Sequence, residues 1–220
     1  MQRRCVDNVF RPAKGACLFL TEGVTHEFGW LESFFCCETQ WEKYMDALDR
    51  IDKKEIRDLL GKSWLTHDGM WFYHTYQEVG IEKANKLNKA AIRSLAPIEI
   101  NRVKKVLAID EVKIVAFEDL KDFILEALEI ILPNTVFKRF QFTVSTKGLF
   151  HWEWEYGECF AYKGMKKIGI IDGYNCGVMY RIECWLEAMG IPFNVNPKIS
   201  KCMMHEKGAC SGNIRVMLND

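Results

Sequence analysis

The chain has 220 residues, and its 30 basic side chains balance its 30 acidic ones. The length suits one domain, or one domain with an appendage. The balanced charge excludes a globally basic nucleic-acid binder, the 49% apolar share excludes a disordered chain, and no apolar run reaches the roughly 18–20 residues of a membrane helix. The unusual feature is the nine cysteines, an odd number that excludes a complete disulfide framework within the chain.

Residues 1–44 show neither helical nor strand periodicity, although they contain four of the cysteines. Two alternatives stay open: an irregular N-terminal arm that packs on the body, or a segment foreign to the natural protein, with Met45 as the true start. The charged start has no apolar core of a secretory signal behind it. We therefore expect a cytoplasmic protein with free thiols, whose residues 45–220 form a single α+β domain.

Helical periodicity begins after Met45. Asp52 is the predicted N-cap of a first helix, with Glu55 completing a capping box, and this helix should end at Gly61. Further helices are predicted over 63–79, closed by Gly80, and over 81–95, with Pro97 ending or kinking the helix before 98–107. The strongest amphipathic pattern predicts a helix over 117–132.

From residue 136 the apolar period changes to two, which predicts an antiparallel hairpin around residues 147–148. A two-residue loop without a bulge would set the Trp face against polar side chains. We therefore expect a three-residue loop that pairs Val144 with Trp152 and Phe142 with Trp154, or a bulge at Gly148. The remainder predicts a short helix up to Gly169, a helix from 172 or 173 to 189, a short strand at 191–195, a loop over 197–212 and a last strand at 212–218. Helices followed by a hairpin indicate an α+β fold, with N-terminal helices packed on a small antiparallel sheet and a C-terminal helix.

The most specific chemical pattern is Cys202-x2-His205-x4-Cys210 in a glycine-containing segment. Zinc takes Cys and His at such short spacings, and the fourth position is open to Cys159, Cys176, Cys184 or a water, with Cys176 preferred. A closed four-ligand site would be structural, whereas an open position would be catalytic. The alternative is a polar loop with two partly buried thiols and a surface histidine.

A second pattern places His67, Trp71 and His74 on one helical face. His67 is a candidate acid/base group, and the other two are candidate ligand-binding residues, along with Trp152 and Trp154 of the hairpin. The alternative is that His67 is a structural, hydrogen-bonded histidine next to an aromatic core and that the hairpin tryptophans are sheet core. Cys176 is expected in the first turn of its helix, where the dipole lowers a thiol pKa, which makes it the preferred nucleophile. No phosphate-binding loop or nucleic-acid motif is present.

The runs SWLTHDGMWF (63–72), EVGIEKAN (78–85) and NPKISKC (196–202) resemble an uncharacterised prokaryotic family related to L-2-amino-thiazoline-4-carboxylic acid hydrolase. The similarity covers about residues 50–218. The cysteine loop departs from the Cys-x2-Cys-Pro pattern associated with that family, because His205 stands at the second cysteine position. That hydrolase opens a thiazoline ring to give an N-carbamoyl amino acid. The resemblance therefore implies a Cys176 or Cys202 thiolate, or a bound metal, with His67 as acid/base.

The sequence thus predicts a small-molecule-binding protein, acting as a hydrolase on a cyclic amidine-like or C–N bond through a Cys/His or metal site. The alternative is a non-enzymatic metal, ligand or thiol-redox sensor. Zinc is the expected cofactor if there is one, and the expected partner is a small-molecule ligand rather than nucleic acid or a membrane. The sequence leaves open whether the chain forms a homo-oligomer.

Overall fold

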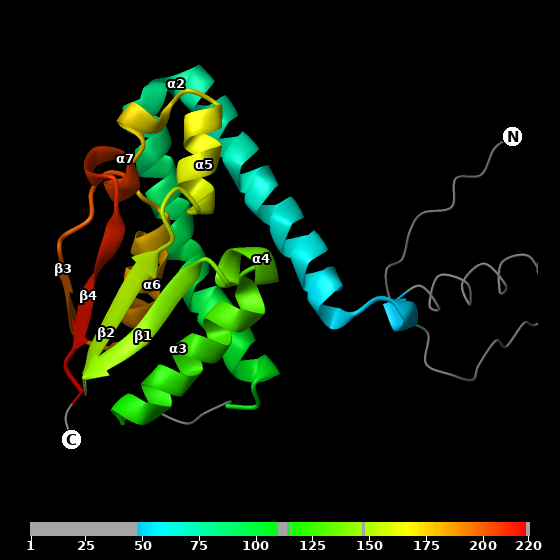
Figure 1. The fold of residues 1–220 in the computed structure, drawn as a ribbon, viewed down its shortest axis with the longest axis vertical. Coiled ribbons are helices and arrows are strands. Elements are labelled where there is room, and N and C mark those ends of the chain that lie inside the picture. Colours follow the sequence, from blue (N-terminus) through cyan, green and yellow to red (C-terminus); the bar gives the residue numbers. More distant parts are fainter. Residues whose placement is uncertain (1–47, 110–113, 115, 147, 219–220) are drawn as a thin grey trace, which may run out of the picture. The chain divides into compact units, whose positions relative to one another are not determined.

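A computed structural model describes residues 48–109, 114, 116–146 and 148–218. Residues 50–220 cluster as one compact unit, and the predicted N-terminal arm lies outside the described residues. The predicted α+β class is confirmed (Figure 1). The helices are α2 (Lys53–Val106), α3 (Phe117–Ile131), α4 (Asn134–Phe137), α5 (Phe160–Lys167), the 3-10 turn η1 (Ile171–Gly173), α6 (Val178–Ala188) and α7 (Met203–Lys207). The strands are β1 (Phe140–Thr146), β2 (Leu149–Trp154), β3 (Phe193–Asn196) and β4 (Cys210–Val216).

Helix α2 consists of two legs joined at Gly80. Asp52 caps its start as predicted, with its carboxylate accepting from the Lys54 N–H at 2.7 Å. Gly80 has φ +79° and ψ +167°, which interrupts the helical ladder, and Figure 1 shows the chain turning back there. The second leg therefore returns beside the first, and the space between the legs becomes available for side chains from other elements.

One of the predicted helix ends is wrong. The helix continues through Gly61, where a Cβ would lie 2.9 Å from Cγ of Pro133, so this glycine serves the close approach of the α4 start. Of the two alternatives at Pro97, the helix does not end there but continues over the predicted 98–107 stretch, because Ala96, Ile100 and Val103 are buried and hold both sides of the proline in the core. Tertiary packing here outweighs local propensity.

The four strands form one antiparallel sheet in the order β1-β2-β4-β3. The predicted register of the hairpin is wrong by two residues, since Val144 pairs with Phe150 and Phe142 with Trp152. The loop has two residues, and the irregularity lies between Val144 and Thr146 rather than at Gly148. A shift of two keeps every side chain on its face, so the predicted apolar face is still the buried one.

The apolar face of β2 packs into the helical layer. Phe150 and Trp152 are fully buried, and the Phe150 ring contacts Phe117 of α3 at 5.1 Å between centroids. Trp154 contacts Phe160 of α5 at 6.0 Å. The intervening residue Glu153 is exposed. One side of the sheet therefore forms the core with the helices.

The C-terminal part differs from its prediction in three places. Residues 134–137 are helical rather than the start of the strand, and α6 begins at Val178 rather than at 172 or 173. The predicted loop 197–212 contains α7 and the first residues of β4. Asn85 of α2 holds the segment before α6, since its amide donates to the Gly173 carbonyl at 2.8 Å and accepts from the Asn175 N–H at 3.0 Å. These two hydrogen bonds position the segment that leads into α6, and the local sequence pattern could not predict them.

Candidate functional site

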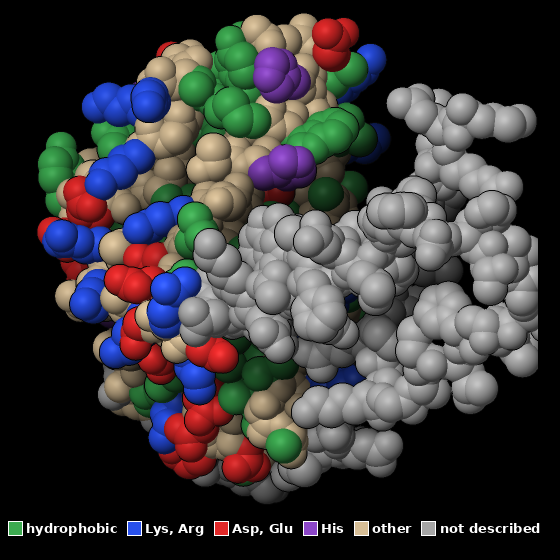
Figure 2. Space-filling view, turned by 90° about the vertical axis from the view of Figure 1, so that its right-hand side faces the viewer, with side chains coloured by type: hydrophobic (Ala, Val, Ile, Leu, Met, Phe, Trp, Pro, Cys, Tyr) green, Lys and Arg blue, Asp and Glu red, His purple; other side chains and the backbone are tan. Residues whose placement is uncertain are grey.

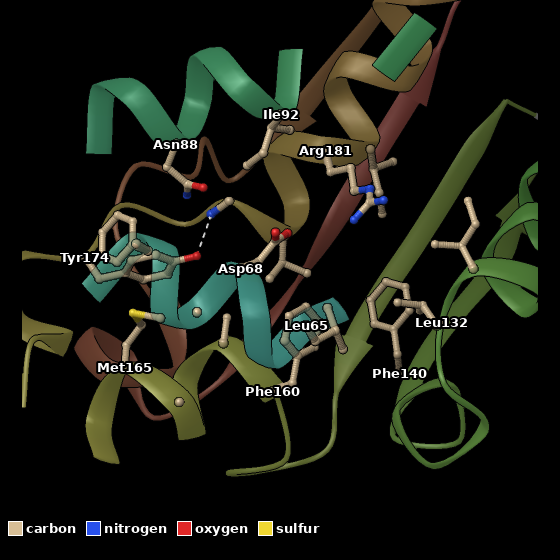
Figure 3. A pocket seen from close by; sticks show the side chains of 18 of the residues that line it. Leu65, Asp68, Asn88, Ile92, Leu132, Phe140, Phe160, Met165, Tyr174 and Arg181 are labelled. Carbon is tan, nitrogen blue, oxygen red and sulfur yellow. Dashed lines mark hydrogen bonds between the residues drawn. The ribbon is translucent and has the colours of Figure 1, made fainter. Parts of the chain in front are cut away.

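A central cavity of about 160 Å³ lies among α2, α3, α5, α6 and the sheet (Figure 3). Its wall is mainly apolar, with Leu65, Phe72, Ile92, Phe140, Phe160 and Met165 among the lining residues. An apolar cavity of about 150 Å³ is large enough to hold a benzene-sized ring. The central cavity therefore suits a single-ring ligand.

Polar side chains stand at one side of the central cavity. Figure 3 shows the carboxylate of Asp68 and the guanidinium of Arg181 directed into the same region, with Asn88 nearby on the second leg of α2. Tyr174 closes another side, and its hydroxyl accepts from the Gly177 N–H at 3.1 Å. The indole N–H of Trp154 is buried in the wall without a hydrogen-bond partner among the described residues. These groups give an apolar chamber a few oriented polar contacts, the usual composition of a ligand site.

Arg181 is held in place by Glu99. Its Nε donates to Glu99 Oε2 at 2.8 Å, and its Nη2 donates to Oε1 of the same carboxylate. The indole of Trp185 donates to Glu99 Oε2 at 2.7 Å, and the guanidinium lies 4.4 Å from the Trp64 ring centroid. Glu99 is 9% exposed. This bidentate, aromatic-flanked arrangement fixes the guanidinium before any ligand arrives.

Asp68 is a carboxyl with a perturbed pKa in this region. Burial raises the pKa of its carboxyl above the usual value, while the electrostatic effects of Arg181 and His67 oppose this shift. Asp68 itself is nevertheless exposed to solvent. A carboxyl with a raised pKa beside a cavity can pair with a cationic ligand or exchange a proton with it.

The central cavity adjoins a groove near the Gly80 turn, called here the apex groove. Both are lined by Asp68, Phe72, Asn88, Ile92 and Arg181. The apex groove continues between the two legs of α2, where Trp71 and Leu87 line it. Because the polar groups belong to both spaces, the apex groove is a route by which a ligand can reach them.

The predicted helical face of His67, Trp71 and His74 is exposed. Trp71 is 65% exposed, and its ring contacts that of His67 edge-on at 6.4 Å between centroids. Figure 2 shows histidine and apolar side chains together on this side of the molecule. Trp71 lines the apex groove, whereas His67 and His74 line neither it nor the central cavity.

Sequence reasoning missed Asp68, which immediately follows His67. The signal was available: Leu65, Asp68 and Phe72 share a helical face by their spacing of three and four, so Asp68 is an acid on an apolar face. Arg181 and Glu99 carried no comparable signal, because 82 residues separate them. Of the hairpin tryptophans, Trp154 lines the central cavity and Trp152 does not.

Four cysteines of the C-terminal half lie close together. The Cys176 N–H donates to the Ser200 carbonyl at 3.1 Å, and a β-bridge joins Asn175 to Lys201, next to Cys202. Cys210 is paired with Trp154 on the neighbouring strand. In agreement with these contacts, Cys176 acts electrostatically on both Cys159 and Cys210. We call Cys159, Cys176, Cys202 and Cys210 the thiol cluster; all four are buried and free.

Burial raises the pKa of every thiol in this cluster. The pKa of Cys210 rises to about 12, although the indole of Trp152 acts in the opposite direction. For Cys176 the expected lowering is wrong. Cys176 precedes the N-cap Gly177, and although the Val178 and Met179 N–H groups favour its thiolate, burial outweighs them. The cluster is therefore protonated near neutral pH, which makes its thiols weak nucleophiles.

The predicted zinc ligands are only partly together. His205 is exposed and its Nε2 bonds Asp172 Oδ1 at 2.7 Å, while Cys202 is buried at the N-cap of α7. Within the described ranges, no group of three or more Cys, His, Asp or Glu side chains is arranged to hold a metal ion. None of the four cluster thiols lines the central cavity. A zinc site at Cys202, His205, Cys210 and Cys176 stays a prediction.

The comparisons with known proteins leave the function open. No helix in the described part of the chain has the length and apolar character required to cross a membrane. A search of curated proteins finds no match. Residues 47–141 match a family of unknown function (DUF6125), a range that contains Asp68, Asn88 and Glu99 but neither Arg181 nor the thiol cluster.

Proposed function

We propose that this protein binds a small, single-ring cation of the cyclic amidine class in the central cavity and hydrolyses it. The observation that carries this proposal is the position of Asp68 and Arg181 at one side of an apolar cavity of about 160 Å³. Arg181 already forms an ion pair with Glu99, so the Asp68 carboxylate remains available to pair with a positively charged ligand. A planar amidinium offers two N–H donors to such a carboxylate.

The raised pKa of Asp68 supports an acid/base role. A general acid or base works best when its pKa approaches the working pH, and burial moves this carboxyl in that direction. In the proposed reaction, water adds to the amidine carbon while Asp68 accepts its proton. The bond between that carbon and the ring heteroatom then breaks, Asp68 returns the proton to the leaving heteroatom, and the added hydroxyl releases its own proton to solvent as the carbamoyl C=O forms. This reaction class rests on the resemblance to the thiazoline hydrolase and on the position of Asp68.

The predictions that assign catalysis to Cys176, Cys202 and His67, or to a metal, use residues that do not line the central cavity. They describe a competing mechanism, which the same experiment addresses. The non-enzymatic alternative, a ligand or thiol-redox sensor, shares the binding step but predicts no turnover.

The test is calorimetric titration of the full chain with 2-amino-2-thiazoline and with its uncharged isostere 2-methyl-2-thiazoline. We expect saturable binding of the amidine, with the isostere at least tenfold weaker. Asp68→Asn should weaken amidine binding at least tenfold, since a charge-assisted hydrogen bond is lost. His67→Asn is the matched control, because His67 is the neighbouring residue and lines neither space.

Turnover is followed by mass spectrometry as the addition of one water to the ligand. Equal binding of the amidine and its isostere, or an unchanged affinity in Asp68→Asn, contradicts the binding site. Binding without turnover supports the sensor alternative and contradicts the hydrolase. Turnover that survives Asp68→Asn but not Cys176→Ala assigns the chemistry to the thiol cluster.

A further inference from the structure

A second groove lies between the legs of α2 and the C-terminal end of α3. Its volume is about 800 Å³, within the range of small-ligand pockets, and we call it the basic groove. Ile56, Leu60, Trp64, Leu95, Val103 and Ile130 supply its apolar wall. Ile131 is the single residue that also lines the central cavity, so the two spaces are distinct.

The basic groove carries an excess of positive charge. Lys53, Lys54, Arg57 and Arg102 line it, against one acid, Glu99. Glu99 is already neutralised by Arg181, which lies outside this groove. Within the described ranges, Lys53, Lys54 and Arg102 form no ion pair. The groove therefore presents three uncompensated cations beside apolar side chains.

Arg57 is the most buried of the four cations, with 18% of its side chain exposed. Its Nη1 donates to the Glu129 carbonyl at 2.6 Å, and the Glu129 carboxylate is 3.9 Å away and mostly exposed. The Nε of Arg57 is buried without a partner among the described residues. This guanidinium is thus anchored to α3 but not neutralised by a close bidentate partner.

Charge and apolar surface are separated along the groove. Lys53, Lys54 and Arg57 lie at the start of the first leg, and Arg102 lies near the end of the second. Trp64 and Leu95 lie closer to the Gly80 turn along each leg. Seven helical residues separate Arg57 from Trp64, which corresponds to about 10 Å. The groove is therefore basic at one end and apolar for roughly the length of a medium alkyl chain.

We infer that the basic groove binds a single-chain anionic amphiphile, of which a medium-chain fatty carboxylate is the simplest example. The head group pairs with the cations at the basic end, and the chain covers Leu60 and Trp64. Leu60 and Val106 are 64% and 71% exposed without such a ligand. Burying apolar surface contributes roughly 25 cal/mol per Å², which supplies the chain-length dependence of binding.

The experiment is calorimetric titration of the full chain with decanoate below its micellar concentration, beside butyrate and decyltrimethylammonium. We expect saturable one-to-one binding of decanoate, at least tenfold weaker binding of butyrate, and no saturable binding of the cation. Affinity should fall as salt is raised. Asp68→Asn should leave decanoate affinity within twofold, which separates this site from the central cavity.

Two charge reversals on one helical turn give the matched comparison. Arg102→Glu should weaken decanoate binding roughly tenfold to a hundredfold, because an attractive head-group contact becomes repulsive. Lys105→Glu changes the same charge on an exposed residue that does not line the groove, and affinity should change less than twofold. Circular dichroism checks that both variants are folded.

Equal effects of the two reversals, or equal binding of the anionic and cationic amphiphiles, overturn the inference. It is also overturned if decanoate does not bind and light scattering shows a dimer that Leu60→Asp dissociates, because the occupant is then a second copy. Binding of an acidic amphipathic peptide without binding of decanoate likewise replaces the ligand by a protein partner.

Discussion

The thiol cluster and the central cavity both gather chemically active side chains from distant parts of the chain, but they differ in the space left around them. The thiols are buried, free and protonated near neutral pH, and none lines the central cavity. Asp68 and Arg181 stand beside a space of about 160 Å³ that can admit a ring. The difference teaches that reactive residue types mark a candidate site only where the packing leaves room for a ligand.

The largest expected effect is that of Glu99→Ala, which tests how firmly the cavity's guanidinium is anchored. The change leaves Arg181, whose side chain is 19% exposed, without its counter-charge and removes the acceptor of the Trp185 indole. Breaking a buried ion pair costs about 3–5 kcal/mol in the free energy of unfolding. Denaturant unfolding measures it.

Glu187→Ala is the control, since Glu187 pairs with the exposed Arg93 at 3.2 Å. An exposed pair contributes less than about 1 kcal/mol. A similar small loss for both variants would mean that the Glu99 network does not anchor the site.

The thiol cluster should react very slowly with alkylating reagents in the native state. A pKa of about 12 for Cys210, against about 8.5 for a free thiol, lowers the thiolate fraction at pH 8 by roughly a thousandfold, equivalent to about 4 kcal/mol. Alkylation by iodoacetamide, resolved by peptide mass spectrometry, should therefore modify Cys210 about a thousand times more slowly in native than in unfolded protein. Rapid native modification would make the cluster the reactive region and reverse the comparison.

Activity separates the two regions directly. Asp68→Asn should lower kcat/KM for the cyclic amidine about a hundredfold, because a general acid/base group contributes at least that factor. This corresponds to about 2.7 kcal/mol. Cys176→Ala should change kcat/KM less than threefold, since Cys176 does not line the cavity. The opposite pattern would assign catalysis to the predicted thiol.

The smallest effect is a pH-dependent change in stability from the same carboxyl. Because the folded pKa of Asp68 is raised, the charged form is disfavoured in the folded state at neutral pH. Asp68→Asn should therefore stabilise the protein at pH 7, by less than about 1 kcal/mol after allowance for solvent screening. The gain should disappear as the pH falls below about 3.9, where Asp68 is protonated in both states.

Thermal unfolding of the variant and the wild type between pH 3 and pH 8 measures this gain. Asp58→Asn is the contrasting variant, because hydrogen bonds from Lys62 and Asn134 lower the pKa of Asp58 despite the opposing effect of burial. The ionised Asp58 carboxylate stabilises the folded protein at neutral pH, so Asp58→Asn should destabilise the protein there, and this loss should disappear as the pH falls. A change of stability with the same sign in both variants at neutral pH would contradict the assigned directions.

Local patterns predicted much of the fold. The α+β class, the Asp52 cap, the break at Gly80 and the apolar face of the hairpin are confirmed. The hairpin register was wrong by two residues, because a shift of two leaves every side chain on its face and periodicity cannot detect it. The helix through Gly61 was missed because the Pro133 contact that uses this glycine comes from another element.

The candidate site divides in the same way. The amino-acid sequence by itself determined that Leu65, Asp68 and Phe72 share one helical face and that His67, Trp71 and His74 share another, because a helix repeats every 3.6 residues. The tertiary structure alone decided which face lines a cavity, which direction the pKa of Cys176 moves, and that Arg181 meets Glu99. The burial of a helix face and the free volume beside it depend on which distant residues pack against that face. The local spacing of apolar residues does not identify those residues.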